Sequence, residues 1–175
     1  DEVLTTPVTD MGSLIAIVQC NCIPVFADVD PLTMLIDPAT IEDRITDRTR
    51  ALMVVHLLGQ PCNMDEIMQI VEEHDLYLIE DCAQSHDAKW DGKDVGTFGD
   101  LGCFSLQQSK QITTGDGGIV VTDDPDLADE AYRFHDKYYD RSGGGRPVDR
   151  VGMNYRMSEL VGAVALAQVR KLDRI

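Results

Sequence analysis

Short apolar runs alternate with amphipathic segments along most of the chain, and the two patterns predict different elements. The apolar runs are rich in β-branched residues and are bounded by proline, glycine, asparagine or aspartate, which is typical of buried strands. We therefore expect strands over Val3–Thr6, Pro24–Asp28, Ala51–His56, Leu76–Glu80, Gly102–Leu106 and Gly118–Thr122.

The segments between these runs repeat their apolar residues at helical spacing. The clearest follows Asn63, which can cap a helix, and it places Ile67, Ile70 and Val71 on one face. We predict helices over Ser13–Gln19, which should be buried, and over Pro38–Ile45, Met64–His74, Leu127–Lys137 and Ser158–Leu172.

The alternation of strands and helices predicts an α/β fold. Strands that are apolar throughout belong to a mostly parallel sheet with helices on both faces. In such sheets, ligands bind beyond the carboxyl ends of the strands. His56, Gly59, Gln60 and Asp81 lie at or just after predicted strand ends, so we expect them to converge on that edge.

The charge balance restricts the classes of partner. The chain has 175 residues, enough for one buried core, and its net charge is −16. Nucleic acids and anionic membranes are bound by basic surfaces, so neither is an expected partner. No apolar stretch approaches the roughly 20 residues of a membrane span, and no signal-like segment opens the chain. We expect a cytoplasmic protein, of which this chain, lacking an initiator methionine, is a piece.

The five cysteines are interpreted as free thiols in a reducing compartment. A metal site formed by Cys20, Cys22, His56 and Cys62 is the alternative. Their spacing matches no zinc-binding pattern, so no metal is expected.

Lys110 is the strongest candidate for chemistry. It follows an apolar run and precedes a glycine-rich segment, so it lies on a loop of small residues. Asp81 follows the neighbouring predicted strand, and Gln84 is three positions further on. A lysine amine and a strand-end carboxylate are the groups that pyridoxal phosphate (PLP) chemistry needs. The amine forms a Schiff base, and the carboxylate keeps the pyridine nitrogen protonated.

Each of these residues also has an ordinary explanation. Lys110 can be a solvated surface charge, and Asp81 can be a helix cap or half of an ion pair. Gln84 can face solvent, and Ser105 can simply occupy a strand. The residue types by themselves leave both interpretations open.

Two other features bear on the site. The glycine-rich segment 141–149 is either a flexible connector or an active-site lid. His56 and His86 are expected beside the site. No nucleophile elbow, P-loop or GxGxxG pattern is present, which argues against a hydrolase and a nucleotide-binding fold.

Five segments resemble motifs of the PLP-dependent sugar aminotransferases of the DegT/StrS type. They are PVFADVD at 24–30, VHLLGQP at 55–61, IEDCAQSH at 79–86, VGTFGDLGCFS at 95–105 and GMNYRMSE at 152–159. The resemblance covers nearly the whole chain. It implies the three-layer αβα large domain of the aspartate-aminotransferase-like (fold type I) PLP enzymes. Residues 1–175 would be part of that PLP-binding domain, without its N-terminal segment and without the small C-terminal domain.

The resemblance also implies roles for individual residues. Lys110 would hold PLP covalently, and Asp81 would contact the pyridine nitrogen. Gln84 would bind the cofactor hydroxyl, and Ser105 the phosphate. Asn154 would reach the phosphate in the partner subunit of a homodimer with shared active sites.

Two positions depart from the family pattern. Met11 stands where an aromatic residue often stacks on the cofactor ring, and its thioether can still pack there. Asp87 adds a negative charge where the family has glycine.

The activity that the resemblance implies is transamination. Glutamate or glutamine would give the amino group, and a nucleotide-linked keto-sugar or a keto-cyclitol would receive it. One alternative is a PLP-dependent sugar dehydratase, against which Lys110 argues because that chemistry usually replaces the lysine with histidine. The other is a non-catalytic PLP-binding sensor or regulator.

Overall fold

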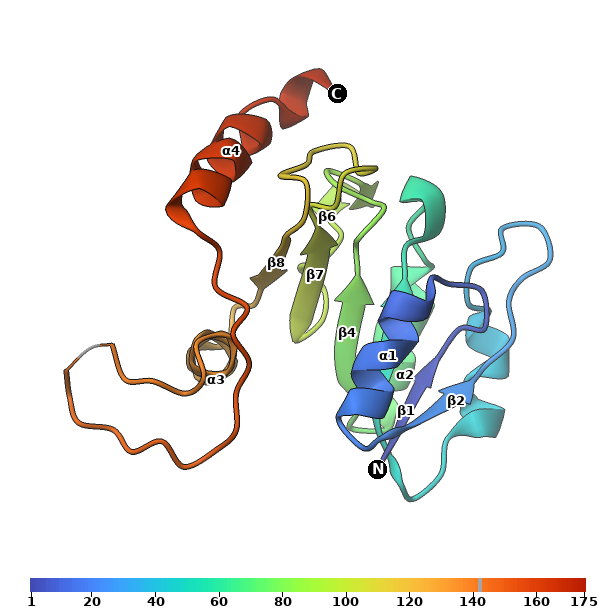
Figure 1. Cartoon of the computed structure of the whole chain (residues 1–175). Coiled ribbons are helices and arrows are strands. Elements are labelled where there is room, and N and C mark those ends of the chain that lie inside the picture. Colours follow the sequence, from blue (N-terminus) through green and yellow to red (C-terminus); the bar gives the residue numbers. More distant parts are fainter. Residues whose placement is uncertain (142) are drawn as a thin grey trace.

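A six-stranded sheet forms the centre of the computed structural model, which describes residues 1–141 and 143–175 (Figure 1). The strand order is β2-β1-β3-β4-β7-β8, and all neighbours are parallel except β7 and β8. The strands are β1 (Glu2–Thr5), β2 (Ile23–Phe26), β3 (Thr49–Val55), β4 (Tyr77–Asp81), β7 (Leu101–Ser105) and β8 (Gly118–Val121). The predicted mostly parallel α/β sheet is confirmed.

Helices cover both faces of this sheet. They are α1 (Met11–Gln19), α2 (Met64–Glu73), α3 (Pro125–His135) and α4 (Glu159–Val169). Successive strand residues point to opposite faces. Accordingly, Leu52 and Val54 of β3 pack with the α2 side, whereas Ala51 and Met53 pack with Ile17 of α1. In Figure 1, α1 lies in front of the strands and α2 behind them.

Two predicted helices differ from the structure. The segment Pro38–Ile45 forms two short 3₁₀ turns, Pro38–Thr40 and Glu42–Arg44, instead of one helix. Ile41 between them is fully buried while most of its neighbours are not, and a 3₁₀ segment is enough to bury one apolar residue.

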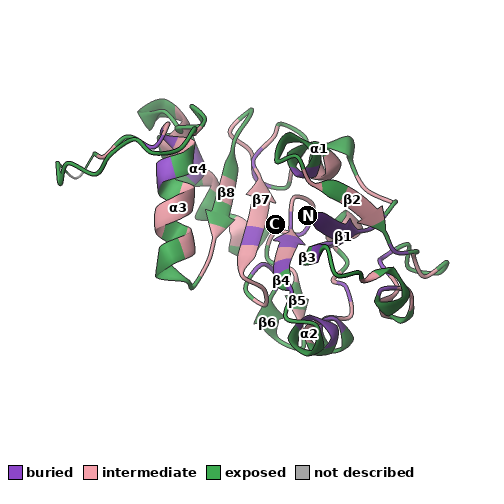
Figure 2. Cartoon of the chain, turned by 90° about the horizontal axis from the view of Figure 1, so that it is seen from below, coloured by how far each residue is buried: buried purple, intermediate pink, exposed green. Residues whose placement is uncertain are grey.

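Helix α1 begins at Met11, where the side chain of Asp10 accepts a hydrogen bond from the Gly12 N–H (2.7 Å). The expectation that this helix is buried is wrong. Only Ile17 is buried, because a single face of α1 meets the sheet (Figure 2).

A two-stranded hairpin, β5 (Lys89–Trp90) and β6 (Lys93–Asp94), was not predicted. Asp91 and Gly92 turn between its strands with positive φ angles, which is the Asp-Gly signal of a tight hairpin. The strands are too short to show an alternating pattern.

The C-terminal part of the chain leaves the sheet and returns to it. The segment after α3 makes a wide loop away from the sheet before α4 comes back (Figure 1). Ala165 of α4 then packs against Leu106 and Ile112, which flank the lysine loop. No described helix has both the length and the apolar character that crossing a bilayer requires.

Candidate functional site

A cavity of about 450 Å³ lies at the carboxyl ends of the central strands. Four of the residues singled out from the sequence line it, namely Asp81, Gln84, Ser105 and Lys110. They come from the end of β4, the loop after it, the end of β7 and the loop that follows β7. The volume is within the range of small-molecule sites.

Asp81 is the last residue of β4, between β3 and β7. Its carbonyl oxygen accepts a hydrogen bond from the His56 N–H (3.1 Å), which continues the parallel ladder. The carboxylate is held at both oxygens, because Ser13 Oγ donates to Oδ2 (2.6 Å) and the Ala83 N–H donates to Oδ1 (3.0 Å). Thr9 Oγ1 lies 2.8 Å from Ser13 Oγ and extends this chain of hydroxyl groups. The plane of the carboxylate is therefore fixed.

Lys110 lies on a loop with its own internal hydrogen bonds. Its N–H donates to the Gln107 carbonyl (3.0 Å), and the Ser109 N–H and Oγ both donate to Gln107 Oε1 (2.7 Å each). Ile112 is 1% exposed and anchors the loop in the small core under α4. Across the described parts of the chain, no carboxylate pairs with the half-buried Lys110 ammonium group.

The other two polar groups are oriented by the backbone. The Leu58 N–H donates to Gln84 Oε1 (2.8 Å), which fixes the orientation of that amide. The Gln107 N–H donates to Ser105 Oγ (3.2 Å), which leaves the hydroxyl proton of Ser105 able to donate. Both side chains can therefore offer hydrogen-bond donors to a ligand in the cavity.

Glu80 lies beneath the cavity and is fully buried. Its carboxylate accepts hydrogen bonds from His56 Nε2 (3.1 Å) and from the backbone N–H groups of Gly96 (2.7 Å), Phe98 (2.7 Å) and Gly99 (2.8 Å). Burial by itself raises the pKa of Glu80, but the bonds from His56, Gly99 and Gly96 outweigh it and hold that pKa below its ordinary value. Glu80 is thus an ionised carboxylate that ties the 96–99 loop to β4.

His56 is also buried, next to Glu80. The Cys62 N–H donates to His56 Nδ1 (3.1 Å), so Nε2 carries the proton that is donated to Glu80. His56 therefore acts as a fixed hydrogen-bond donor under the site and does not line the cavity.

One buried group has the composition of a metal site. His56, Glu80 and Cys82 bring one ligand atom each within 4.8 Å of one another. Both Glu80 oxygens already accept N–H bonds, however. Burial, and then the charge of Glu80, raises the pKa of the Cys82 thiol well above its ordinary value, which favours the thiol over the thiolate that binds cations. We interpret the group as structural.

Two of the residues singled out from the sequence lie outside the cavity lining. Met11 is 65% exposed, whereas its neighbours Asp10 and Gly12 line the cavity. Asn154 is bridged to Asp136 just after α3, and its side chain accepts a hydrogen bond from Arg156 Nε (3.0 Å). Within one chain, neither residue joins the group around Lys110.

The 143–149 part of the glycine-rich segment runs beside α3, away from the cavity of its own chain (Figure 1). Arg146 forms a two-pronged pair with Asp129 (2.9 and 2.8 Å), and Arg150 pairs with Glu130 (2.7 Å). These ion pairs tie the segment to α3, so the segment does not form a lid over the cavity of its own chain. Residue 142 lies outside the described residues.

Sequence reasoning missed Thr9, Ser13 and Glu80. The only available signal was for Glu80, a second acid directly before Asp81 at the end of an apolar strand. Thr9 and Ser13 carry no such signal, because Ser13 lies 68 positions from Asp81 in the chain and Thr9 reaches the site only through Ser13.

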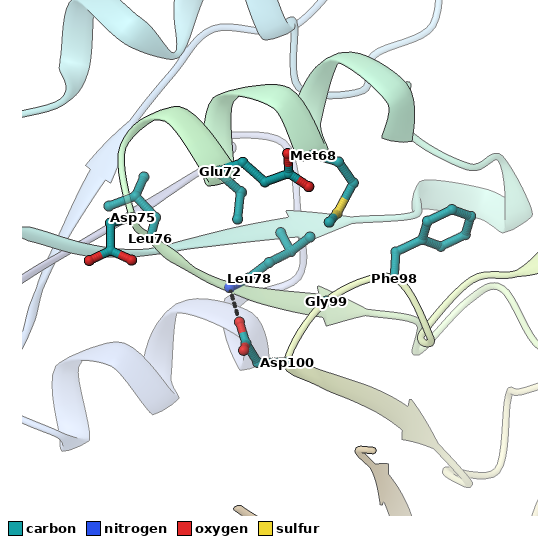
Figure 3. A pocket seen from close by; sticks show the side chains of 9 residues that line it. Met68, Glu72, Asp75, Leu76, Leu78, Phe98, Gly99 and Asp100 are labelled. Atoms are coloured by element: carbon teal, nitrogen blue, oxygen red, sulfur yellow. Dashed lines mark hydrogen bonds between the residues drawn. The ribbon is translucent and has the colours of Figure 1, made fainter. Parts of the chain in front are cut away.

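A second cavity, of about 340 Å³, lies under α2 near the opposite end of β4 (Figure 3). Met68, Leu78 and Phe98 point into it, and the Leu78 N–H donates to Asp100 Oδ2 (2.7 Å) at its edge. No cation lines it, and it holds none of the residues expected to bind a cofactor. The Lys110 cavity is therefore the candidate functional site.

Known proteins resemble this chain over its whole length. The family profile described as the DegT/DnrJ/EryC1/StrS aminotransferase family matches residues 1–175. GDP-perosamine synthase of Escherichia coli O157:H7 is 40% identical over 179 residues, which cover 99% of this chain and 47% of that protein. The putative L-glutamine:3-amino-2,3-dideoxy-scyllo-inosose aminotransferase of Micromonospora echinospora is 42% identical over 180 residues, which cover 100% of this chain and 42% of that protein. The chain thus spans less than half the length of these curated relatives.

Solved structures share the fold. The X-ray structure of an aminotransferase from Psychrobacter cryohalolentis superposes with a TM-score of 0.89 at 38% sequence identity. The match covers 98% of this chain and 46% of that one. The strand order and the helices on both faces are therefore those of a known group of enzymes.

Proposed function

The chain belongs to the DegT/DnrJ/EryC1/StrS aminotransferase family, and we propose that the intact protein is a PLP-dependent aminotransferase. Glutamine or glutamate would give the amino group, and a nucleotide-linked keto-sugar or a keto-cyclitol would receive it. The names of the E. coli and Micromonospora relatives support these substrate classes. The chain would form part of the PLP-binding large domain of a cytoplasmic homodimer.

One observation carries the proposal. Lys110 and Asp81 line the same cavity, yet the Asp81 carboxylate is bonded to Ser13 and Ala83 and not to the lysine. Opposite charges that share a cavity attract each other strongly when nothing else engages them. A ligand that uses the amine and the carboxylate at separate atoms explains why the fold holds them apart.

The donors and acceptors around the cavity fit PLP. When bound, this cofactor supplies an electron sink for carbon–nitrogen bond chemistry. The Asp81 carboxylate would hold a proton on the ring nitrogen, and Ser13 and Ala83 would keep that carboxylate in plane. Gln84 would bind the ring hydroxyl, and Ser105 would bind the phosphate.

Lys110 would have two tasks. Its Nζ atom would hold the cofactor covalently, and it would also move a proton at the substrate carbon that exchanges its amino group. Met11 would pack near the ring at the mouth of the cavity. Asn154 would serve the phosphate in the cavity of the partner subunit, which fits its distance from the cavity of its own chain.

Cofactor attachment can be tested by chemical trapping. We expect borohydride reduction of the PLP-loaded intact protein, followed by peptide mapping, to place the label on Lys110. Lys110→Ala should abolish the label, and Lys93→Ala should retain it because Lys93 lies on the exposed β5–β6 hairpin. A label on Lys89 or Lys137 in the wild type would refute the assignment.

Turnover separates an enzyme from a sensor. Incubation with glutamine labelled on its α-amino nitrogen and a nucleotide-linked keto-sugar or keto-cyclitol should transfer the label to the acceptor. Asp81→Ala should still bind PLP but lose most of this transfer, because an unprotonated ring is a poor electron sink. Cofactor binding without transfer to any acceptor of either class would favour a non-catalytic sensor.

A further inference from the structure

Gln111, the residue after Lys110, connects the lysine loop to the loop that follows β4. Its Nε2 donates a hydrogen bond to the Gln84 carbonyl oxygen (2.9 Å), and its Oε1 lies 3.0 Å from His86 Nδ1. Since Nε2 is the donor toward Gln84, Oε1 is the acceptor, and His86 Nδ1 carries the shared proton. One side chain thus joins the two loops that carry Lys110 and Gln84.

The partners of Gln111 are themselves held in place. The His86 ring contacts the Phe104 ring of β7, with centroids 5.6 Å apart. The amide oxygen of Gln84 is held by the Leu58 N–H (2.8 Å). Gln111 therefore binds to a part of the molecule that the sheet keeps in position.

The lysine loop is otherwise tied to its own strands. Its other hydrogen bonds run within the loop or back to Leu106, as from the Thr114 N–H (2.9 Å) and from Thr113 Oγ1 (3.0 Å). In the described ranges, Gln111 provides the only side-chain hydrogen bonds from this loop to the loop after β4. Within the described residues, Gln111 is therefore the side chain that ties the lysine loop to the loop after β4 by hydrogen bonds.

We propose that Gln111, together with His86, is a positioning residue that holds Lys110 at its working distance from the Asp81 edge of the cavity. This inference rests on the proposed function for its catalytic meaning, but its structural part stands by itself. Gln111 is exposed, so its bonds contribute little to global stability and act on the loop. A small displacement of a reacting amine is costly for the rate, because reacting atoms must be aligned.

The structural part is tested by hydrogen–deuterium exchange on the intact protein without cofactor. Gln111→Ala should raise the exchange rate of the 107–114 peptide about threefold or more, at an unchanged melting temperature. Gln108→Ala, a change at an exposed glutamine of the same loop, should leave that exchange rate at the wild-type value. Equal exchange in Gln111→Ala and wild type would overturn the proposal.

A double-mutant cycle tests the shared hydrogen bond. His86→Phe keeps an aromatic ring against Phe104 but removes the Nδ1 donor. If Gln111 and His86 act as one unit, the double variant should exchange less than the product of the two single effects predicts. If the two single effects simply multiply, the Gln111–His86 hydrogen bond does not help to hold the lysine loop, and the positioning role of His86 would be overturned.

The catalytic part is tested with the PLP-loaded enzyme. Gln111→Ala should lower kcat by about fivefold to tenfold while KM for the amino acceptor changes less than about twofold, because the reacting amine moves and the substrate contacts do not. PLP attachment to Lys110, followed by visible absorbance, should slow in the same variant. Unchanged kcat and attachment rate would overturn the catalytic role.

The two proposals fail differently. If wild-type Lys110 takes no PLP while Gln111→Ala still loosens the loop, the aminotransferase proposal is wrong and the positioning of Lys110 stands. If PLP labels Lys110 and neither the exchange rate nor kcat responds to Gln111→Ala, the positioning role is wrong and the aminotransferase proposal stands.

Discussion

Glu80 and Asp136 are both buried carboxylates, yet the fold satisfies them by different means. Glu80 lies under the candidate site, and its partners are three backbone N–H groups and a buried imidazole. Asp136 lies just after α3, and its partners are the side chains of Lys137 (3.1 Å), Arg141 (2.7 Å) and Arg156 (3.3 Å). Those three side chains are between 30% and 49% exposed.

The difference concerns how rigid each region is. Backbone donors are placed by the fold and lose no side-chain entropy when they bind a carboxylate. Long cationic side chains must be ordered, and water and salt compete for them. We call Glu80, His56 and the 96–99 loop the platform under Asp81. The donors in this platform are fixed by the fold. The region after α3 is instead held by ion pairs that water and salt can weaken.

The pKa values of both acids lie below the ordinary range, and in both cases hydrogen bonds outweigh burial, but the donors differ. For Glu80, burial is the largest single effect, and hydrogen bonds from His56, Gly99 and Gly96 together outweigh it. For Asp136, the hydrogen bond from the Arg141 side chain is the largest single effect, and burial opposes it.

The largest effect is expected for Glu80→Ala. This change leaves His56 and three backbone N–H groups without an acceptor in the core, so the free energy of unfolding should fall by about 3–5 kcal/mol. Urea denaturation followed by circular dichroism measures it. Glu72→Ala, at an exposed acid on α2, should change the free energy by less than about 0.5 kcal/mol. A loss for Glu80→Ala no larger than that of the control would show that the platform does not depend on this carboxylate.

Gly102→Ala tests how closely the 96–99 loop must approach β7. A Cβ atom at Gly102 would overlap the Gly96 carbonyl oxygen. Backbone atoms cannot move aside as easily as the end of a flexible side chain, so the loop itself would have to shift. We expect a loss of about 1–3 kcal/mol, measured in the same denaturation experiment. Gly162→Ala on α4 is the matched control. Its nearest neighbour would be 3.9 Å away, so stability should rise by about 0.5–1 kcal/mol. Equal effects of the two changes would contradict the close approach.

The pH dependence separates Glu80 from an ordinary buried acid. Its folded pKa is lowered, so its ionisation contributes stability that is complete above the ordinary pKa of 4.5 and is lost as the pH falls through the lower folded value. The difference in unfolding free energy between wild type and Glu80→Gln should therefore be constant above pH 4.5 and shrink below it. A difference that grows on acidification would mean that the acid is protonated in the folded state.

The smallest loss of stability is expected for Asp136→Asn, and its size should depend on the salt concentration. The three cations that surround Asp136 are partly exposed, so the loss in melting temperature at low ionic strength should shrink in about 1 M NaCl, where the Debye length is about 3 Å. The loss for Glu80→Gln should stay the same in both solutions. If salt reduced both losses equally, the contrast between the two regions would be wrong.

Much of the scaffold was predictable because it depends on local pattern. The apolar run at 51–56 and the run ending at Glu80 became β3 and β4, since buried parallel strands need apolar residues on both faces. The helix after Asn63 formed as predicted, and Asn63 caps it. Helix α3 begins at Pro125 and not at Leu127, because Asp124 caps it and proline suits the first turn.

The candidate site was only half predictable. The carboxyl-edge rule and the family resemblance singled out Asp81, Gln84, Ser105 and Lys110, and the structure places them around one cavity. Their roles stay a prediction until the cofactor is trapped. Glu80, in the same motif as Asp81, could not be distinguished from a solvent-facing strand end.

Local pattern in the sequence was enough to predict the six strands of the central sheet, its mostly parallel arrangement and the loop on which Lys110 lies. These features follow from periodicity and from residue chemistry, both of which are local. The folded chain was needed to show that Ser13 holds the Asp81 carboxylate, that Glu80 binds the 96–99 loop, and that Gln111 reaches across to Gln84 and His86. Hydrogen bonds between distant segments depend on distances of a few tenths of an ångström, and the packing of the whole chain sets those distances.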